Sequence, residues 1–239
     1  MAKLFRVVDF EITAITHYDS LNLKKYCKKI FVVKDYSLKT LEKIFLETDP
    51  YQKKSFLLGS GFAENHKRSK IFNNRKNYGN DFKVNCFVKN KEFFKKLKKN
   101  KILFPKLIKK NSLKQTLIKN LKSFGSQNVK KLENKNYNLK KNEYFQELID
   151  GKRISVQFIS KIRQLRIISV CDQVLKKKTF FIDYLITKRL SKKKQNQIYT
   201  LVKKIVKIFN LKGINNIDII DKKNKLYLIE INSRPGLSS

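Results

Sequence analysis

The sequence is short of residues that cross-link a chain or interrupt its regular structure. Among 239 residues there are three cysteines, three prolines, seven glycines and no tryptophan. The cysteines, Cys27, Cys86 and Cys171, lie far apart and form no C-x-x-C pair. This spacing argues against a disulfide framework and predicts buried free thiols in a reducing compartment.

Long apolar segments are also missing. No apolar run approaches the roughly 18 residues that a membrane-spanning helix needs. The N-terminal stretch MAKLFRVVDF has neither the long apolar core nor the small-residue cleavage site of a signal peptide. We therefore expect a cytoplasmic protein without a membrane partner.

Acidic residues are scarce, with 19 Asp and Glu against 56 Lys and Arg and a net charge of +37. One interpretation is a polyanionic partner, either nucleic acid or an anionic membrane. The other is codon bias, because residues with AT-rich codons are abundant and residues with GC-rich codons are depleted. The lysines are scattered through every segment rather than clustered. We therefore interpret the charge mainly as codon bias, which leaves weak, salt-sensitive binding of polyanions open.

The rest of the composition is typical of a globular protein, with 41% hydrophobic residues. The first half predicts strands over residues 10–16, 31–36 and 54–62, a helix or loop over 19–30, and a helix over 37–47 that is capped by Ser37. Such alternation predicts a small α/β unit with parallel strands. Because MAKLFRVV resembles the end of a helix, we expect this unit to lack its opening strand.

A domain boundary is predicted at Pro105, where an extended linker follows a helix within residues 90–107. The predicted domains are therefore residues 1–104 and 105–239, and the second divides into subdomains 105–148 and 149–239.

The second domain predicts a mixed α/β (α+β) fold. Residues 115–132 predict strand, turn and strand, and residues 142–173 predict three antiparallel strands with a turn at Asp150 and Gly151. An amphipathic helix follows, with Ser191 as its N-cap and Gly213 beyond its end. Two closing strands, 214–220 and 226–232, flank the polar turn DKKNK.

Three polar residues interrupt these closing strands. Side chains alternate along a strand, so Glu230 and Asn232 share a face, with Leu228 below them, and Asp218 reaches that face if the strands pair. Carboxylates are costly to bury unpaired, whereas hard divalent cations prefer such oxygen ligands. Arg234 follows and suits phosphate groups. The alternative is that the two acids pair with lysines on an exposed face.

The stretch GINNIDIIDKKNKLYLIEINSRPG resembles the metal-binding end of the ATP-grasp superfamily. The resemblance implies that Asp218, Glu230 and Asn232 bind Mg²⁺, or Mn²⁺, bridging the phosphates of ATP, with Arg234 matching the arginine of the motif. It also implies the ATP-grasp fold, preceded by a small α/β unit.

Two earlier segments resemble further parts of this fold. YFQELIDGKRISVQF is similar to its hinge strand, and TLIKNLKSFGSQNV is similar to its lysine-bearing strand and phosphate loop. The resemblance implies adenine contacts from the Gln146 side chain and from the backbone of Glu147, Leu148 and Ile149. It implies phosphate contacts from Lys119, Gly125 and Ser126.

The first half is similar to a narrower group, the ATP-grasp carboligases related to biotin carboxylase. LLGSGFAEN and NYGND resemble its GSGFE turn and later GN, although Ala63 displaces Glu64 by one position. Arg153 stands where relatives often have a ribose-binding acid, and Asn216 stands where some have an arginine. The chain resembles a member of this group that is shortened at both ends.

The resemblance implies an ATP-dependent ligase that joins a small-molecule carboxylate to an amine, or to a thiol, through an acyl-phosphate. Arg234 and Arg166 would stabilise the transferred phosphoryl group, and no side-chain nucleophile is needed. The isolated His17 and His66 agree with this mechanism. A homodimer stays open, and no specific nucleic acid is expected.

Two alternatives stay open. Arg153, the glycine-poor loop and the shortened ends favour a degenerate nucleotide-binding module without ligase activity. The second alternative is a basic nucleic-acid-binding protein, which predicts clustered lysines with exposed aromatic residues between them.

Overall fold

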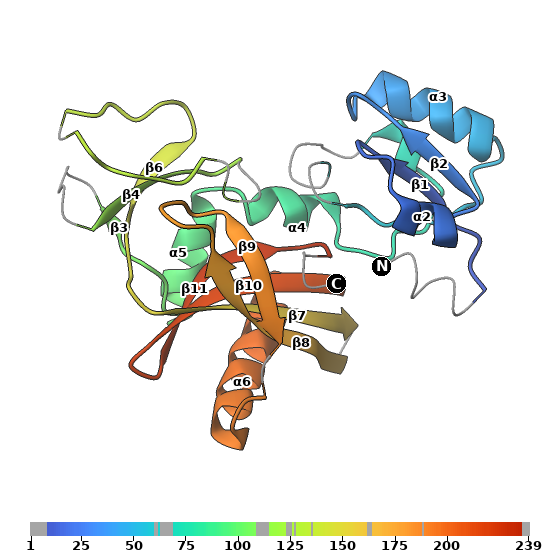
Figure 1. Cartoon of the computed structure of the whole chain (residues 1–239). Coiled ribbons are helices and arrows are strands. Elements are labelled where there is room, and N and C mark those ends of the chain that lie inside the picture. The colour runs from blue at the N-terminus through green and yellow to red at the C-terminus, as the bar shows by residue number, and fades with distance from the viewer. Residues whose placement is uncertain are drawn as a thin grey trace. The chain divides into compact units, whose positions relative to one another are not determined.

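The computed structural model describes residues 9–59, 62, 69–108, 115–122, 126, 128–134, 136–161, 164–187 and 189–235. The chain divides into two compact units, one formed by Met1–Phe56 and Arg68–Asn77 and the other by Leu57–Lys67 and Tyr78–Ser239. Both units mix helices and strands, which confirms the α/β (α+β) fold class (Figure 1). The predicted helical end at residues 1–8 lies outside the described residues.

The first unit is a small α/β arrangement. It contains β1 (Thr13–Thr16), α2 (Leu21–Tyr26), β2 (Lys29–Val32), α3 (Leu38–Thr48) and the short 3-10 helix η1 (Lys70–Phe72). Strands β1 and β2 pair in parallel, as the alternation of segments predicts. The Ser37 side chain accepts a hydrogen bond from the Thr40 N–H and so caps α3, which confirms the predicted cap.

The predicted strand over residues 54–62 is wrong for its described part. Phe56 makes only an isolated parallel bridge with Asn77, and residues 57–59 form no strand. The Phe56 ring instead packs on Phe72, whose ring also meets Phe45 edge to face. The apolar side chains in this segment therefore serve aromatic packing, a role that a run of hydrophobic letters does not distinguish from a strand.

A buried ion pair holds the end of α3 in this unit. The Arg75 Nε donates to Asp49 Oδ2 at 2.9 Å, and both side chains are about 95% buried. Burial opposes ionisation, but the N–H groups of Lys53 and Lys54 together with Arg75 outweigh it and lower the pKa of Asp49. The pair therefore contributes to stability only while the carboxyl is ionised.

The second unit contains two sheets. The smaller has the strand order β3-β6-β4-β5, and the larger has the order β11-β10-β7-β8-β9. The smaller sheet consists of β3 (Leu107–Ile108), β4 (Thr116–Asn120), β5 (Lys130–Lys131) and β6 (Glu143–Glu147). The larger consists of β7 (Lys152–Lys161), β8 (Gln164–Leu175), β9 (Ile182–Thr187), β10 (Gly213–Lys222) and β11 (Lys225–Asn232). Three helices complete the unit: α4 (Phe82–Phe87), α5 (Glu92–Lys99) and α6 (Lys192–Phe209).

The three strands predicted over residues 142–173 exist, but they do not form one antiparallel sheet. β6 pairs with β3 and β4, whereas β7 pairs with β8 and β10. Gly151 is therefore not a hairpin turn. A Cβ atom there would lie 2.7 Å from Ile220 Cγ2 and 2.8 Å from the Asp221 carbonyl oxygen. Glycine allows the chain to approach β10 closely as it passes from one sheet to the other.

Helix α6 packs on one face of the larger sheet. Its buried residues Ile198, Val202, Ile205 and Phe209 meet the core with Val156 and Ile217 from the strands. The Ser191 side chain accepts from the Lys194 N–H, which confirms the predicted N-cap. The helix ends at Asn210 in the left-handed conformation rather than at Gly213, because asparagine also tolerates that conformation. Gly213 instead opens β10.

The hairpin of β10 and β11 forms as predicted, with Lys223 and Asn224 at its tip. A bulge between Asp218 and Ile219 shifts the register, so that Leu228 pairs with Ile219 and joins the apolar core. The prediction that Leu228 shares a face with Glu230 is therefore wrong. One extra residue in a strand reverses the direction of all side chains beyond it.

All three cysteines are unpaired, as predicted, but only Cys171 is buried. Cys86 is exposed on α4, and Cys27 is partly buried. Among the described residues, no helix combines the length and the apolar character needed to cross a bilayer.

The second compact unit begins before the predicted domain boundary at Pro105. Its core includes Phe93, Phe94 and Leu97 of α5, which pack with residues of α6 and the larger sheet. The domain limits of 1–104 and 105–239 stay a prediction.

Replacing Asp49 by alanine should lower the free energy of unfolding by about 3–5 kcal/mol, because Arg75 keeps its buried charge and loses its partner. The folded-state pKa of Asp49 is lowered, so the contribution is complete above about pH 4 and is lost as the pH falls through that pKa. Urea unfolding followed by circular dichroism at neutral and acidic pH measures both effects.

The control is Asp19→Ala, which removes an exposed ion pair with Lys24. This variant should change stability far less. Equal losses in the two variants would show that the burial of the Asp49 pair has no energetic consequence.

Candidate functional site

Asp218 and Glu230 lie directly opposite each other on β10 and β11, and Asn216 lies opposite Asn232. Cross-strand partners share a face, with Cβ atoms about 4.5–5.5 Å apart. The face is the one opposite the apolar side that carries Ile217 and Ile231, because side chains alternate along each strand. The hairpin therefore brings two carboxylates and an amide together, as predicted.

Neutral donors surround the Asp218 carboxylate. Gln173 Nε2 donates to Oδ1 at 2.7 Å, Asn216 Nδ2 donates to Oδ1 at 3.2 Å, and Asn232 Nδ2 donates to Oδ2 at 3.2 Å. Burial nevertheless raises the pKa of Asp218 to about 6, and the adjacent Glu230 carboxylate adds to the shift. Two acids placed this close disfavour each other's ionised form unless a cation lies between them.

Cations surround Glu230 instead. Lys89 Nζ lies 3.9 Å from Glu230 Oε1, and the Lys89 side chain is only 10% exposed. Burial opposes ionisation of Glu230, but the charges of Lys89, Lys119 and Arg234 outweigh it and lower the pKa of this carboxyl. Glu230 does pair with a lysine, as the alternative predicts, but Lys119 and Arg234 beside it are both 7% exposed, so the face is largely buried rather than exposed.

Lys119 comes from the smaller sheet. It lies opposite Tyr144 on β6, and its neighbour Leu117 lies opposite Gln146, so these side chains share one face of that sheet. Ile118 and Phe145 point to the other side, into a separate apolar cluster. Burial lowers the pKa of the Lys119 ammonium, and the Glu230 carboxylate opposes that shift. Lys119 of the smaller sheet and Glu230 of the larger sheet are therefore close enough for their charges to interact.

The predicted adenine-binding residues lie at the crossing between the sheets. Gln146 is 1% exposed, and its Nε2 donates to the Pro105 carbonyl oxygen at 3.2 Å. That geometry leaves the Gln146 carbonyl oxygen as the group suited to an amino donor. The backbone N–H of Leu148 donates to the Gln115 carbonyl, and the N–H of Glu147 donates to the Lys106 carbonyl. Ile149 is buried.

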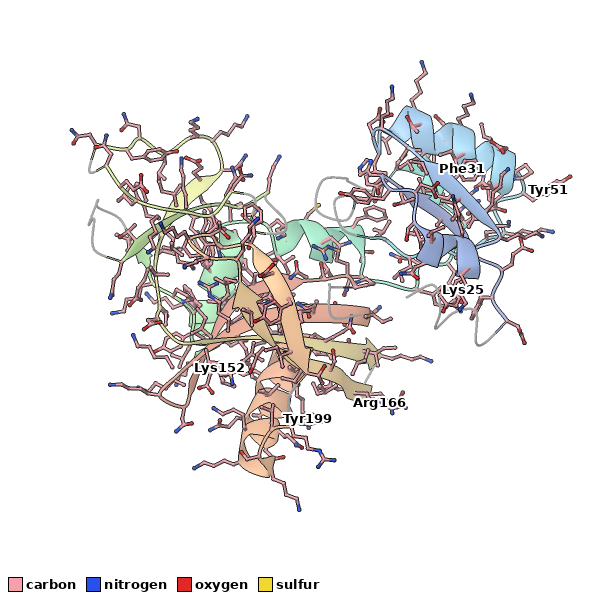
Figure 2. The ribbon with its side chains drawn as sticks, in the orientation of Figure 1. Lys25, Phe31, Tyr51, Lys152, Arg166 and Tyr199 are labelled. Carbon is pink, nitrogen blue, oxygen red and sulfur yellow. The ribbon has the colours of Figure 1, made fainter. Side chains whose placement is uncertain are left out.

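The two predicted arginines occupy different environments. Arg234 is buried, and its Nη2 donates to Asn232 Oδ1 at 3.3 Å, which joins it to the acidic pair. Arg166 is exposed on β8 opposite Ile159, toward one end of the strand (Figure 2). The structure therefore brings Arg234 into the cluster and leaves Arg166 at its margin. Ser126 is described with a positive φ of 61°, whereas Gly125 lies outside the described residues.

Asn80, in the NYGND stretch, braces the end of the hairpin. Its Nδ2 donates to Asn215 Oδ1 at 2.6 Å and to the Ser233 carbonyl at 2.9 Å, and its Oδ1 accepts from the Lys212 N–H at 2.8 Å. Gly213 has φ +68°, and a Cβ atom there would collide with the Tyr78 carbonyl oxygen. Asn80 thus holds the segment that carries Asn232 and Arg234.

Sequence reasoning missed Lys89 and Gln173. Lys89 lies in a lysine-rich segment, where no pattern separates it from its neighbours. Gln173 lies on β8, which reaches the acidic strand only across β7. Strand order alone would have identified Gln173, because it places β8 two strands from β10.

The donor set fits a divalent cation of the magnesium type. Within the described residues, no three His, Cys, Asp or Glu side chains gather to bind a metal. Two carboxylates and the amide oxygen of Asn232 are available, and hard cations bind such oxygen atoms with water and phosphate oxygens as further ligands. Burial, and then the adjacent Glu230 carboxylate, raise the pKa of Asp218, and a bound divalent cation would offset both effects.

The family model of the ATP-grasp domain matches residues 88–238. Among curated proteins, none matches this sequence. An ATP-grasp superfamily protein of Archaeoglobus fulgidus has a similar structure, with a TM-score of 0.67 at 18% identity over 94% of this chain and 81% of that protein.

Two further structures extend the similarity. The N5-carboxyaminoimidazole ribonucleotide synthetase of Thermotoga maritima gives a TM-score of 0.69 at 16% identity. The biotin carboxylase domain of Hydrogenobacter thermophilus 2-oxoglutarate carboxylase, solved with MgADP and bicarbonate, gives 0.74 at 16% identity. The similarity extends over 100% and 99% of this chain, respectively. It extends over only 66% of the synthetase and 61% of the carboxylase domain. Similarity at this level of identity establishes the fold.

Replacing Asp218 by asparagine should shift the stability difference between the metal-free proteins in favour of the variant by about 1–3 kcal/mol between about pH 4 and neutral pH, because the pKa of Asp218 is raised by about two units. A raised folded-state pKa favours the folded protein below about pH 4, and the advantage is lost as the pH rises to about 6. The difference in the free energy of unfolding between variant and wild type should therefore grow as the pH rises from about 4 to about 6. Urea unfolding without divalent cations measures it.

Asp183→Asn is the control, since Asp183 is exposed on β9. No comparable difference should open for this variant. A stability difference between Asp218→Asn and wild type that stays constant from about pH 4 to neutral pH would contradict the raised pKa of Asp218.

Proposed function

This chain belongs to the ATP-grasp family, and from that membership we propose that it is an ATP-dependent ligase that joins a carboxylate to an amine. Its similar structures include the ribonucleotide synthetase, a biotin carboxylase domain and an L-amino acid ligase of Bacillus licheniformis. The proposal concerns a small-molecule carboxylate and amine, with ATP as the energy source and Mg²⁺ as the metal.

One observation carries the proposal: the carboxylate pair Asp218 and Glu230 faces the buried cations Lys119, Lys89 and Arg234. A structural ion-pair cluster needs only as many cations as acids. Here the two acids meet three cations, and Arg153 adds a fourth charge that acts on Asp218. This surplus suits a polyanionic ligand whose phosphates bind the cations while its metal binds the acids.

Each group then has a defined task. Asp218, Glu230 and Asn232 would hold Mg²⁺, which supplies charge neutralisation between the phosphate oxygens. Lys119 and Lys89 bind the phosphates, and Ser126 and Gly125 belong to the loop proposed to cover them. Gln146 and the backbone of Glu147, Leu148 and Ile149 receive the adenine edge. Glycine-poor as it is, the loop can still donate backbone N–H groups to phosphate oxygens.

The reaction follows from this positioning. An oxygen of the substrate carboxylate attacks the γ-phosphorus of ATP, the bond to the β–γ bridging oxygen breaks, and ADP leaves. The amine nitrogen then attacks the acyl carbon, inorganic phosphate leaves, and the nitrogen loses a proton to solvent. Arg234 donates hydrogen bonds to the phosphoryl oxygens as charge moves between them. Arg166, at the margin, is proposed to assist when the substrate lies on this face.

Glu230→Gln should weaken binding of ATP in the presence of Mg²⁺ by roughly tenfold or more, because a metal ligand loses its charge while its shape is retained. Calorimetry at moderate salt measures this, since a chain of charge +37 attracts any triphosphate loosely. The matched control Asp183→Asn removes one negative charge from an exposed position and should leave the affinity unchanged.

Equal binding by wild type and Glu230→Gln, fading as salt rises, would refute the metal site. Saturable, Mg²⁺-dependent binding without turnover of any carboxylate and amine would favour the alternative of a nucleotide-binding module.

Lys119→Met should weaken ATP binding by roughly 10- to 100-fold, which corresponds to the loss of about 1.5–3 kcal/mol from one charge-assisted hydrogen bond. Methionine fills a similar volume, so the buried site keeps its packing. Lys131→Met, at an exposed position on the neighbouring strand β5, removes the same charge and should have little effect. Similar losses in both variants would mean that net charge, rather than a site, attracts the nucleotide.

A further inference from the structure

We propose that Gln157 binds the carboxylate of the ligase substrate, in a subsite next to the acidic pair. This inference rests on the proposed ligase function, and it names the substrate group and the residue that receives it. Gln157 lies outside the motif residues that the family resemblance implies.

Register places Gln157 beside the acidic pair. Along the polar face of the larger sheet, one row contains Ser155, Asp218 and Glu230. We call it the metal row, because its two acids are proposed metal ligands. The next row contains Gln157, Asn216 and Asn232, with Ser169 on the far side of Gln157. Two residues along a strand span about 6.6–6.8 Å, so the Gln157 backbone lies about this far from the metal row, a distance that a small carboxylate can bridge.

Gln157 has an unused donor. Its side chain is 1% exposed, and among the described residues its Nε2 has no hydrogen-bond partner. By contrast, two side chains of the metal row have hydrogen-bond partners: Asp218 accepts from Gln173, and Ser155 donates to Asn216 in the next row. A buried amide without a partner costs free energy unless a ligand or water satisfies it.

The row beyond Gln157 is open. Ile159 is 42% exposed, and its cross-strand partner Arg166 is also exposed on the same face. We place the entrance of the proposed subsite at this exposed row, with Arg166 at its edge and Gln157 one row further in. Arg234 adds a positive charge on the β11 side of this face, where it donates a hydrogen bond to Asn232.

The chemistry of the subsite selects a carboxylate rather than an amine. Gln157 Nε2 offers hydrogen atoms and requires an acceptor, which a carboxylate oxygen provides and an ammonium group does not. The two arginines attract an anion and repel a cation. Asn216 is neutral where some relatives have an arginine, so the unpaired amide of Gln157 is the nearest directed donor in this row.

The geometry gives the carboxylate a defined orientation. Gln157 would hold one oxygen, which leaves the second oxygen directed toward the metal row and the γ-phosphate. That second oxygen forms the new bond to phosphorus as the β–γ bridging bond breaks. Gln157 then donates to the carbonyl oxygen of the acyl-phosphate, and no proton changes place at this residue.

The test uses acetate as a probe and the full chain in solution. In a ¹⁵N-labelled protein, the side-chain amide signal of Gln157 is assigned by its absence from Gln157→Met. We expect acetate to shift this signal saturably, and to leave unchanged the amide of Gln195, which donates to the Leu190 carbonyl on α6. Gln157→Met should bind acetate roughly 5- to 10-fold more weakly by calorimetry.

Three outcomes would overturn the subsite. The first is no shift on adding acetate, and the second is a shift with Mg²⁺-ATP alone but not with acetate. The third is an equal shift with chloride at the same ionic strength, which would mark unspecific attraction of anions to a basic protein. The shift itself is measured on the wild-type chain, and Gln157→Glu, which keeps the side-chain shape, gives a second assignment if Gln157→Met does not fold.

The same experiments separate this inference from the ligase proposal. If ATP binding depends on Glu230 while acetate leaves Gln157 unchanged, the ligase proposal stands and the subsite is wrong. If acetate shifts Gln157 but Mg²⁺-ATP does not bind through Glu230, the carboxylate subsite stands and the ligase proposal fails.

Discussion

The pairing of β10 with β7 on one side and with β11 on the other is the constraint on which the rest of the second unit depends. This pairing directs Ile217 and Ile231 toward α6 and, on the opposite face, places Asp218 beside Glu230. Apolar burial on one face thus provides the free energy that holds two like charges together on the other. The site is an electrostatically unfavourable arrangement that the core keeps in place.

Charge balance explains the arrangement of the second sheet around this pair. Glu230 is kept ionised by Lys89, Lys119 and Arg234, whereas Asp218 relies on neutral amides from Gln173, Asn216 and Asn232. One acid is thus surrounded by charged partners and the other by neutral donors, although the two side chains lie opposite each other. Because Lys119 comes from a different sheet than the acids, separating the two sheets would uncouple the phosphate groups from the metal groups.

Much of this was accessible from the sequence, and the failures have physical causes. Alternation along LYLIEIN and the polar turn before it were enough to predict the hairpin and the convergence of Asp218, Glu230 and Asn232. The bulge after Asp218, which moved Leu228 into the core, was not predicted, because two adjacent apolar residues such as Leu228 and Ile229 also occur in regular strands. The separation of β6 and β7 into different sheets was also not predicted, because Asp150 and Gly151 suit a hairpin turn as well as a close crossing between sheets. Lys89 and Gln157 depend on contacts between distant segments, which local patterns do not encode.

The brace formed by Asn80 joins residues that are very far apart along the chain. Its bonds to Asn215 and Ser233 close loops of 135 and 153 residues. Contacts with such separation form late in folding, because the entropy of closing a long loop must be met before they contribute. The segment bearing Asn232 and Arg234 therefore reaches its final place only after both ends of the unit have met. During synthesis Asn80 is made long before its two partners, so the brace can close only once the segment from Asn215 to Ser233 has been made.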